Sequence, residues 1–248
     1  MISWRFERAP ARTDQNGARM CGNAAGTVQR YGNQTVGLTA VASGFAWTWP
    51  AVHDGVMASN TALLVMDFQV GVVERFGAQS AGLLDAVSTA TGAARAADVP
   101  VIYVRVGFRP GAPEISSRNR TFSAIAGSGR FSDSDPATRI HPAIAPHPED
   151  VVVTKRRVSA FAGSDLDVVL RALEVDSLVL AGIATSGVIL STLRQAADLD
   201  YQLTVLRDAC ADSDAEVHHV LMDKVFSRQA MVVDTAEWVK QLATSGPG

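Results

Sequence analysis

Two charged residues each follow directly on a strongly apolar run of the sequence. Asp67 comes after ALLVM at residues 62–66, and Lys155 comes after VVVT at residues 151–154. A carboxyl group partly removed from water can be tuned for proton transfer, and an ammonium beside it would hold it ionised or stabilise developing negative charge. From position alone, Asp67 could equally be a turn or helix-capping residue, and Lys155 could be an ordinary solvated lysine.

A third segment that could do chemistry is the turn GIATSGV at residues 182–188, which follows the apolar run at 177–181. Small residues in such a turn let backbone amides at a helix N-terminus point outward, which makes a site for an oxyanion or a carboxylate. The alternative is tight packing of a strand against a helix, with no ligand.

The elements that must position these residues alternate along the chain from residue 61 onward. Nearly continuous apolar runs, typical of strands buried on both faces, predict strands at 62–66, 101–106, 151–154, 177–181, 202–206 and 230–233. Amphipathic stretches predict helices at about 79–97, 165–173, 187–199 and 214–226, and a last helix from Thr235. This alternation is typical of βαβ units, so we expect an α/β fold, a three-layer αβα sandwich with a mostly parallel central sheet.

The connection at residues 107–150 is long and rich in proline, glycine and polar residues. Ordered loops of that length inside a compact domain are usually functional. Ligands of open parallel sheets bind beyond the carboxyl ends of the strands. Because this connection leaves such an end, we expect it to line the binding pocket.

Composition narrows the class of protein. The chain has 248 residues, of which 47% are hydrophobic and 19% are charged, as expected for one globular domain. We place this domain at residues 57–243 and expect residues 1–56, which show no sustained periodicity, to be a poorly ordered extension, with Met57 as a candidate native start. A net charge of −3 leaves no broad basic surface for nucleic acid, and no apolar run is long enough to span a membrane.

Two cysteines without metal-ligand or CxxC spacing fit a reducing compartment, and no apolar signal-peptide core is visible. We therefore predict a cytoplasmic protein whose partner is a small-molecule substrate.

Four segments together resemble the isochorismatase-like hydrolase superfamily, also called the cysteine hydrolases. They are ALLVMDFQVG, VVVTKRRVSAFAGSDL, AGIATSGVILSTLRQAADLDY and LTVLRDACAD, and the resemblance covers about residues 60 to 240. It implies a parallel sheet flanked by helices, assembly into homo-oligomers, and catalytic roles for Asp67 and Lys155. It also implies a cis peptide bond between Ile183 and Ala184, with the amides of Ala184 and Val188 as oxyanion donors.

The chain departs from this family at one position. The nucleophilic cysteine of the amidases falls on Val188, which can neither attack a carbonyl nor form an acyl-enzyme. Cys210 is expected to be a small buried residue, and Ser186 and Ser191 are nearby hydroxyls that are off register and have no evident histidine base. Family members that cleave a vinyl ether are known to use the acidic residue without a cysteine.

Three functions remain open on these grounds. In the first, Asp67 donates a proton to an enol-ether carbon and Lys155 supports the acid. In the second, Asp67 activates a water for hydrolysis of a C–N bond. In the third, the chain is a catalytically lapsed member that binds a metabolite or serves as an assembly partner.

Substrate-binding candidates are Gln69, Phe161, Arg109 and Arg118, with Arg105 and Arg120 as further arginines nearby. A guanidinium fork suits a carboxylate-bearing substrate, whereas Gln69 could orient a substrate or simply bond the turn. Nicotinamidases of the family often bind a divalent ion through an Asp-x-His arrangement, which His141 and His147 do not reproduce. We therefore predict no metal and no cofactor.

Overall fold

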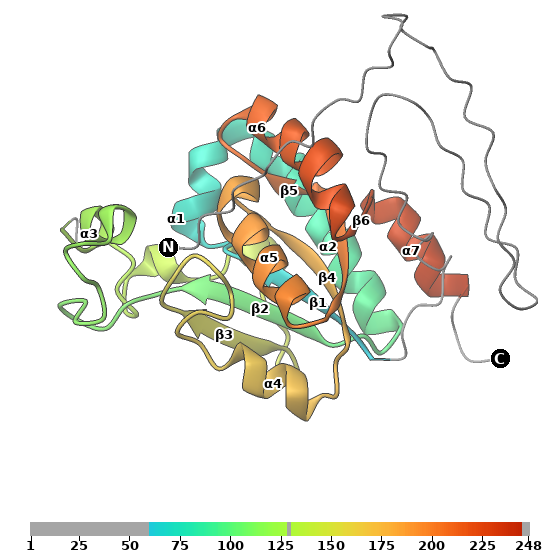
Figure 1. Cartoon of the computed structure of the whole chain (residues 1–248), viewed down its shortest axis with the longest axis horizontal. Helices are drawn as coiled ribbons and strands as arrows, with labels where there is room; N and C mark the ends of the chain where they lie inside the picture. Colours follow the sequence, from blue (N-terminus) through green and yellow to red (C-terminus); the bar gives the residue numbers. More distant parts are fainter. Residues whose placement is uncertain (1–59, 128–129, 245–248) are drawn as a thin grey trace, which may run out of the picture. The chain divides into compact units, whose positions relative to one another are not determined.

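The computed structural model describes residues 60–127 and 130–244 of the chain. The predicted extension at residues 1–56, and Met57, lie outside this part. The described residues form a six-stranded sheet in the order β3-β2-β1-β4-β5-β6, and all neighbouring strands pair in parallel. Helices pack against both faces of this sheet (Figure 1). The predicted three-layer α/β fold is thereby confirmed.

The strands agree closely with the apolar runs. They are β1 (Thr61–Met66), β2 (Val101–Val106), β3 (Val151–Lys155), β4 (Ser177–Ile183), β5 (Gln202–Ala211) and β6 (Met231–Val233). Two strands are longer than the sequence predicts: β4 continues to Ile183, and β5 continues to Ala211. Both extensions run beyond the apolar stretch, because β4 and β5 pair again after a register shift, with Gly182 opposite Cys210.

The helices are α1 (Val70–Val73), α2 (Ser80–Ala96), α3 (Arg120–Gly127), α4 (Leu166–Ala172), α5 (Leu190–Asp198), α6 (Ala215–Val220) and α7 (Thr235–Thr244). Short 3-10 turns are η1 (Glu74–Gln79), η2 (Pro136–Thr138), η3 (Pro142–Ile144) and η6 (Phe226–Arg228). Two predicted α-helices are more complex than periodicity indicates, because each contains a π-helical turn: η4 (Thr185–Ile189) precedes α5, and η5 (Leu221–Val225) follows α6. In the described ranges, no helix is long and apolar enough to cross a membrane.

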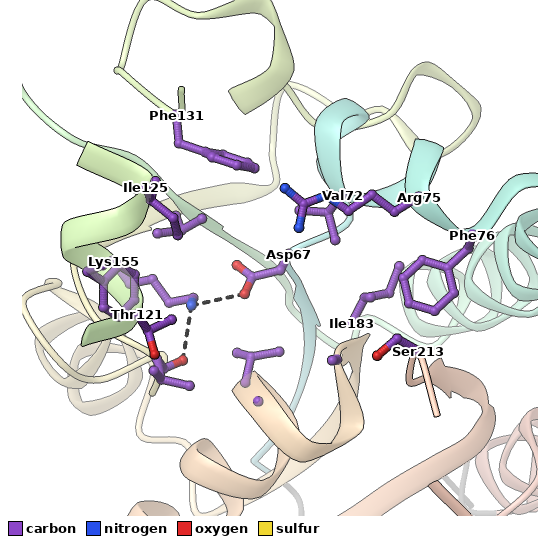
Figure 2. A pocket seen from close by; sticks show the side chains of 16 residues that line it. Asp67, Val72, Arg75, Phe76, Thr121, Ile125, Phe131, Lys155, Ile183 and Ser213 are labelled. Atoms are coloured by element: carbon purple, nitrogen blue, oxygen red, sulfur yellow. Dashed lines mark hydrogen bonds and ion pairs between the residues drawn. The ribbon is translucent and has the colours of Figure 1, made fainter. Parts of the chain in front are cut away.

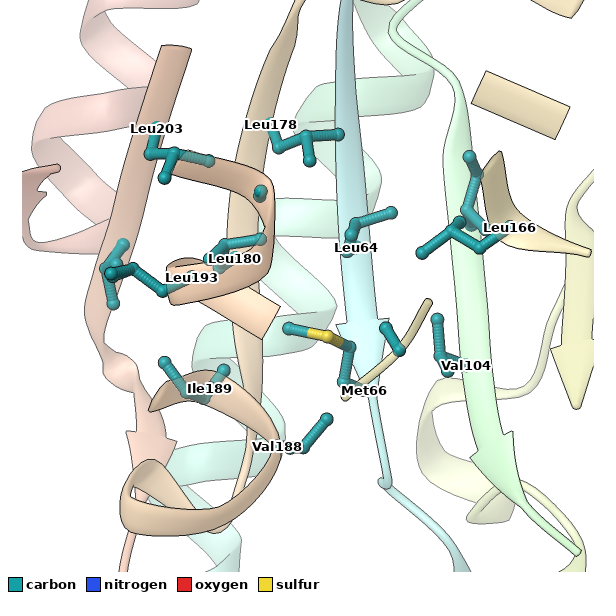
Figure 3. Close-up of a cluster of buried hydrophobic side chains, with 14 of the residues drawn as sticks. Leu64, Met66, Val104, Leu166, Leu178, Leu180, Val188, Ile189, Leu193 and Leu203 are labelled. Carbon is teal, nitrogen blue, oxygen red and sulfur yellow. The ribbon is translucent and has the colours of Figure 1, made fainter. Parts of the chain in front are cut away.

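The core has one hydrophobic cluster on each face of the sheet. All six residues of β1 are buried, and successive side chains of a strand point to opposite faces. Leu64 and Met66 therefore join the cluster that includes α4 and α5, whereas Leu63 and Val65 join the cluster that includes α2 and α7. Figure 3 shows the first cluster, in which Val188 and Ile189 of η4 lie at the end nearest Met66.

Gly182 allows the end of β4 to lie close to the end of β1. It is the register partner of Met66. A Cβ atom at position 182 would lie 2.8 Å from the Met66 carbonyl oxygen, which is closer than side-chain carbons approach a backbone oxygen. Glycine at this position thus brings the turn at residues 182–188 beside the residue that follows Met66, which is Asp67.

The long connection at residues 107–150 is ordered by α3, by two short 3-10 turns and by contacts with the segment after β3. Arg156 forms ion pairs with Asp133, at 3.0 Å, and with Glu114, at 3.6 Å. Phe122 and Phe131 from this connection pack with Phe108 in a small separate cluster. These contacts hold the connection over the carboxyl ends of β1 and β2.

Candidate active site

Asp67 is the first residue after β1 and has an unusual backbone conformation. Its φ angle is 59°, in the left-handed region that few residues other than glycine adopt, although aspartate tolerates it better than most. Its amide donates to the Val104 carbonyl at 2.8 Å, so the backbone is still tied to β2. Only 8% of the residue is exposed. The result is a carboxyl group held at the carboxyl edge of the sheet and largely removed from water.

Lys155 is the last residue of β3, and its side chain reaches across the end of β2 to Asp67. Its Nζ lies 2.9 Å from Asp67 Oδ2 and 3.0 Å from the carbonyl oxygens of both Arg157 and Val158. An ammonium has three N–H donors, and these three acceptors match them. Lys155 is 2% exposed, so its charge is stabilised by this cage rather than by solvent.

The second oxygen of Asp67 has a different environment. Oδ1 is buried and has no hydrogen-bond partner in the described part of the chain. Burial raises the pKa of Asp67 above its ordinary value, and the Lys155 ammonium opposes this shift without cancelling it. Asp67 therefore combines one oxygen fixed by Lys155 with another that is buried without a partner in the described part of the chain, and its carboxyl group takes up a proton more readily than an exposed aspartate.

A cavity of about 730 Å³ opens at this edge of the sheet, with Asp67 and Lys155 in its wall (Figure 2). Most of the remaining wall is apolar, and Phe122, Ile125 and Phe131 come from the long connection, which confirms that this segment lines the pocket. The polar lining residues besides the Asp67–Lys155 pair are Arg75, Thr121 and Ser213. Such a pocket suits a small molecule with an apolar body and few polar groups.

The end of β4 and part of η4 form one side of the pocket. The peptide bond between Ile183 and Ala184 is cis, as the family resemblance implies. Ala184 and Val188 both line the cavity. Within the described part of the chain, the Ala184 amide donates to no other residue. Val188 is 2% exposed and also belongs to the hydrophobic cluster behind it, so its methyl groups present no nucleophile to the cavity.

Gln69 and Phe161 lie outside the lining of this pocket. The side-chain amide of Gln69 donates to the carbonyls of Val106, at 2.8 Å, and Thr138, at 3.0 Å, and accepts from the Val106 amide at 2.8 Å. Both N–H donors of its side-chain amide are thus bonded to main-chain carbonyls. Of the two roles that the sequence left open for Gln69, this is the structural one, in which the side chain bonds the backbone near the turn. Phe161 is buried in the core, with its ring 6.1 Å from that of Tyr201.

The candidate arginines of β2 and of the long connection also lie outside the pocket lining. Arg109 is exposed and pairs with Glu114 at 3.6 Å, and Arg118 is exposed as well. Arg105, in β2, donates to the Thr154 hydroxyl at 3.1 Å. The connection contributes mainly apolar side chains to the cavity.

The other candidate nucleophiles do not meet the pocket either. Cys210 is 5% exposed, and burial raises the pKa of its thiol to about 12, as fits a small core residue. Neither Ser186 nor Ser191 lines the cavity. The structure also contains a hydroxyl–imidazole pair that the sequence did not reveal. Thr185 Oγ1 and His218 Nδ1 are 2.8 Å apart and form a hydrogen bond between η4 and α6, and neither residue lines the cavity.

Arg75 is the pocket residue that sequence reasoning missed. It lies in η1, eight positions after Asp67, and its guanidinium points into the cavity toward the Asp67 carboxyl group (Figure 2). The one sequence signal was a charged pair, Glu74-Arg75, inside the apolar stretch VGVVERFG.

Over residues 60–127 and 130–244, no group of three or more His, Cys, Asp or Glu side chains has the geometry to hold a metal ion. The absence of a metal and of a cofactor stays a prediction.

Comparison with known proteins identifies the family. A model of the isochorismatase domain matches residues 61–237. The uncharacterized isochorismatase family protein YwoC of Bacillus subtilis is 32% identical over 183 residues, which cover 74% of this chain and 94% of YwoC. The ureidoacrylate amidohydrolase RutB of Stutzerimonas stutzeri is 33% identical over 181 residues, 64% of this chain and 73% of that protein.

Solved structures agree with this assignment. The crystal structure of a cysteine hydrolase from Pseudomonas syringae pv. phaseolicola has a TM-score of 0.73 at 27% identity, covering 80% of this chain and 99% of that one. An isochorismatase family protein from Burkholderia thailandensis has a TM-score of 0.66 at 27% identity, covering 76% and 98% of the two chains. The chain therefore belongs to the isochorismatase family of hydrolases.

Proposed function

We propose that this protein hydrolyses a vinyl ether bond of a small metabolite, with Asp67 as the proton donor, Lys155 as its positioning residue and no covalent enzyme intermediate. The observation that carries this proposal is the asymmetry of the Asp67 carboxyl group. One oxygen is held by the Lys155 ammonium at 2.9 Å, the other is buried without a partner in the described part of the chain, and the residue lines the cavity.

The raised pKa of Asp67 supports the role of an acid. A carboxyl group can donate a proton only if it holds one, and burial favours the protonated form. Lys155 has its three donors occupied, so its part is to fix the orientation of Asp67 and to stabilise the carboxylate left after proton transfer.

The proposed reaction is balanced by one water molecule. Asp67 transfers its proton to the terminal carbon of the C=C–O unit, which turns the ether carbon into an oxocarbenium centre. Water adds to that centre and returns a proton to the Asp67 carboxylate. The hemiketal then breaks its C–O bond, so that the products are a carbonyl compound and an alcohol. The amides of Ala184 and Val188 are proposed to hold an oxygen of the substrate during these steps.

Val188 supports a reaction without a covalent intermediate. Its side chain has no nucleophilic atom and is buried against the core at the position of the amidase thiol. The hydroxyls of Ser186 and Ser191 lie outside the pocket lining and offer no replacement.

A second candidate function, hydrolysis of a C–N bond, is favoured by the relatives that are ureidoacrylate amidohydrolases, one of them 33% identical. Here an ionised Asp67 would take a proton from water as the water attacks the carbonyl carbon. The amides of Ala184 and Val188 would bind the tetrahedral oxyanion, and Asp67 would return the proton to the departing nitrogen.

A substrate screen tests the proposal. Enol-ether acids, ureides and aryl amides are incubated with wild type, with Asp67→Asn, and with Asp85→Asn as a control on the exposed surface of α2. We expect one class to be turned over by wild type and by the control, with a loss of about 100- to 10,000-fold in Asp67→Asn. Equal turnover in wild type and Asp67→Asn would reject the site. Binding without turnover in wild type would instead indicate a catalytically lapsed binding protein.

A further inference from the structure

The guanidinium of Arg75 is a charged group in the pocket that the proposed reaction does not use. Arg75 lies in η1, between α1 and α2, and lines the same cavity as Asp67. Its side chain extends along the wall beside Val72, and its end points into the cavity toward Asp67 (Figure 2). The residue is exposed to solvent.

Arg75 has no counter-charge in the described part of the chain. No carboxylate there forms an ion pair with it, and Asp67 is committed to Lys155 at 2.9 Å. The charged lining residues are two cations, Arg75 and Lys155, and one titratable acid, Asp67. The pocket therefore carries a charge of +1 when Asp67 is ionised and +2 when it is protonated, and in both states it would attract an anionic ligand.

The guanidinium group of Arg75 favours one kind of anionic group on the ligand, a carboxylate. A planar guanidinium presents parallel N–H donors that match the two oxygens of a carboxylate, and it is always protonated. The walls beside it are formed by the rings of Phe76 and Phe131 and by Ile125. These surfaces suit a flat unsaturated or aromatic body rather than a sugar or a polyphosphate.

A second polar group defines the other end of the ligand. Asp67 lines this cavity, and its Oδ1 is buried without a hydrogen-bond partner in the described part of the chain, so a ligand in the cavity would present a polar group to this carboxyl group. The ligand would therefore carry a carboxylate at one end and its reacting atoms at the other, with an apolar body between them.

We infer that Arg75 is a specificity-determining residue, which binds the carboxylate of a small unsaturated or aromatic acid and so aligns the acid against Asp67. This inference deepens the proposed function and rests on it for the reaction at Asp67, whereas the binding itself is independent of turnover. It replaces the loop arginines Arg109 and Arg118 as the residues that recognise the carboxylate.

The test compares each acid with its neutral amide. Cinnamate and cinnamamide, and benzoate and benzamide, are titrated into the full-length protein by isothermal titration calorimetry and by saturation-transfer NMR. The proteins are wild type, Arg75→Met, Arg75→Lys and Arg228→Met, the last removing an exposed arginine of η6 away from the pocket lining.

We expect wild type and Arg228→Met to bind the acids more tightly than the amides by roughly 10- to 100-fold, as a charge-assisted hydrogen-bonded pair gives. In Arg75→Met this preference falls to about one, because only the carboxylate contact is lost, and Arg75→Lys retains part of it. An undiminished preference in Arg75→Met, or the absence of any preference for the acids in wild type, overturns the inference.

The same panel separates this inference from the proposed reaction. Asp67→Asn is expected to keep the preference for the acids while losing turnover. If no substrate is turned over but the preference depends on Arg75, the proposed reaction fails and the inference stands. If turnover depends on Asp67 but the preference does not depend on Arg75, the inference fails and the proposed reaction stands.

Discussion

Lys155 Nζ lies 2.9 Å from Asp67 Oδ2, while its two other donors are taken by the carbonyl oxygens of Arg157 and Val158. These contacts occupy every donor of the ammonium, so Lys155 can bind a substrate only by releasing one of them. Its effect on a reaction is therefore transmitted through Asp67. The stability of the fold and the protonation of Asp67 are both tied to this one contact.

Replacing Lys155 by Met should destabilise the protein by about 3–5 kcal/mol at about pH 8, because an ionised Asp67 is left buried without its partner. The loss should be smaller at about pH 5. The pKa of Asp67 is already raised in wild type and should rise further without the ammonium. Below this raised pKa the carboxyl group of the variant is neutral and needs no partner. The loss of stability should therefore develop as pH rises through the pKa of Asp67 in the variant. Urea unfolding at the two pH values measures the difference.

The exposed lysine of η5 provides the control for this change. Lys224→Met should alter the free energy of unfolding by no more than about 0.5 kcal/mol at either pH. A loss in Lys155→Met that is the same at both pH values would mean that Asp67 does not respond to its neighbour.

The pH dependence of kcat/KM should distinguish the two proposed reactions. For vinyl ether cleavage Asp67 must be protonated, so the rate is highest at low pH and falls as pH rises through the raised pKa of Asp67. For C–N hydrolysis with Asp67 as base, the rate rises through the same value. A profile of the active substrate, measured over the range in which the protein stays folded by circular dichroism, decides between them.

Introducing a thiol at position 188, which the family resemblance assigns to the amidase nucleophile, should create a reactive cysteine. In a Cys21→Ser background, Val188→Cys should take up one carbamidomethyl group from iodoacetamide, because position 188 lines the same cavity as Lys155 and a small reagent would reach it from there. The parent protein should take up none, since its remaining thiol, Cys210, lies in the core outside the cavity lining and burial raises its pKa to about 12. Intact-protein mass spectrometry counts the adducts.

The outcome of the labelling bears directly on the geometry. An unlabelled Val188→Cys protein would show that position 188 does not face an accessible cavity. Labelling of Cys210 in the parent would contradict its place in the core.

Gln69→Leu should lower stability far more than it alters substrate binding. The substitution leaves the Val106 amide and carbonyl and the Thr138 carbonyl without their partner, and each buried polar group left unpaired costs about 1–3 kcal/mol. Thermal unfolding should register this loss, while KM of the folded protein changes less than about three-fold. Gln202→Leu, at the exposed start of β5, is the control. A large rise in KM without loss of stability would restore Gln69 as a substrate-binding residue.

The central strands β1, β2 and β4 were predictable because they are buried on both faces. A nearly continuous apolar run such as residues 62–66 is typical of a strand inside a parallel sheet, and the structure places it there. The same logic located Asp67 and Lys155, since the carboxyl ends of parallel strands meet at one edge. The π-helical turns at η4 and η5 were not predictable, because an insertion of this kind leaves the apolar periodicity almost unchanged.

The rest of the site depends on loops, where a residue's position says little about its direction. Arg109 and Arg118 occupy the connection that lines the pocket, yet they face away from the cavity. Arg75 occupies a short 3-10 turn with no periodic pattern, and it faces inward. Gln69 was ambiguous because an amide serves a ligand and a backbone equally well, and only the three contacts made in the fold decide.

Val188 belongs at once to the hydrophobic core and to the wall of the cavity. A substitution at this position therefore acts on packing and on chemistry at once. A side chain of similar size would keep most of the contacts with the neighbouring leucines and isoleucine, whereas its functional group would decide whether the cavity contains a nucleophile. The fold by itself does not tie this site to one reaction.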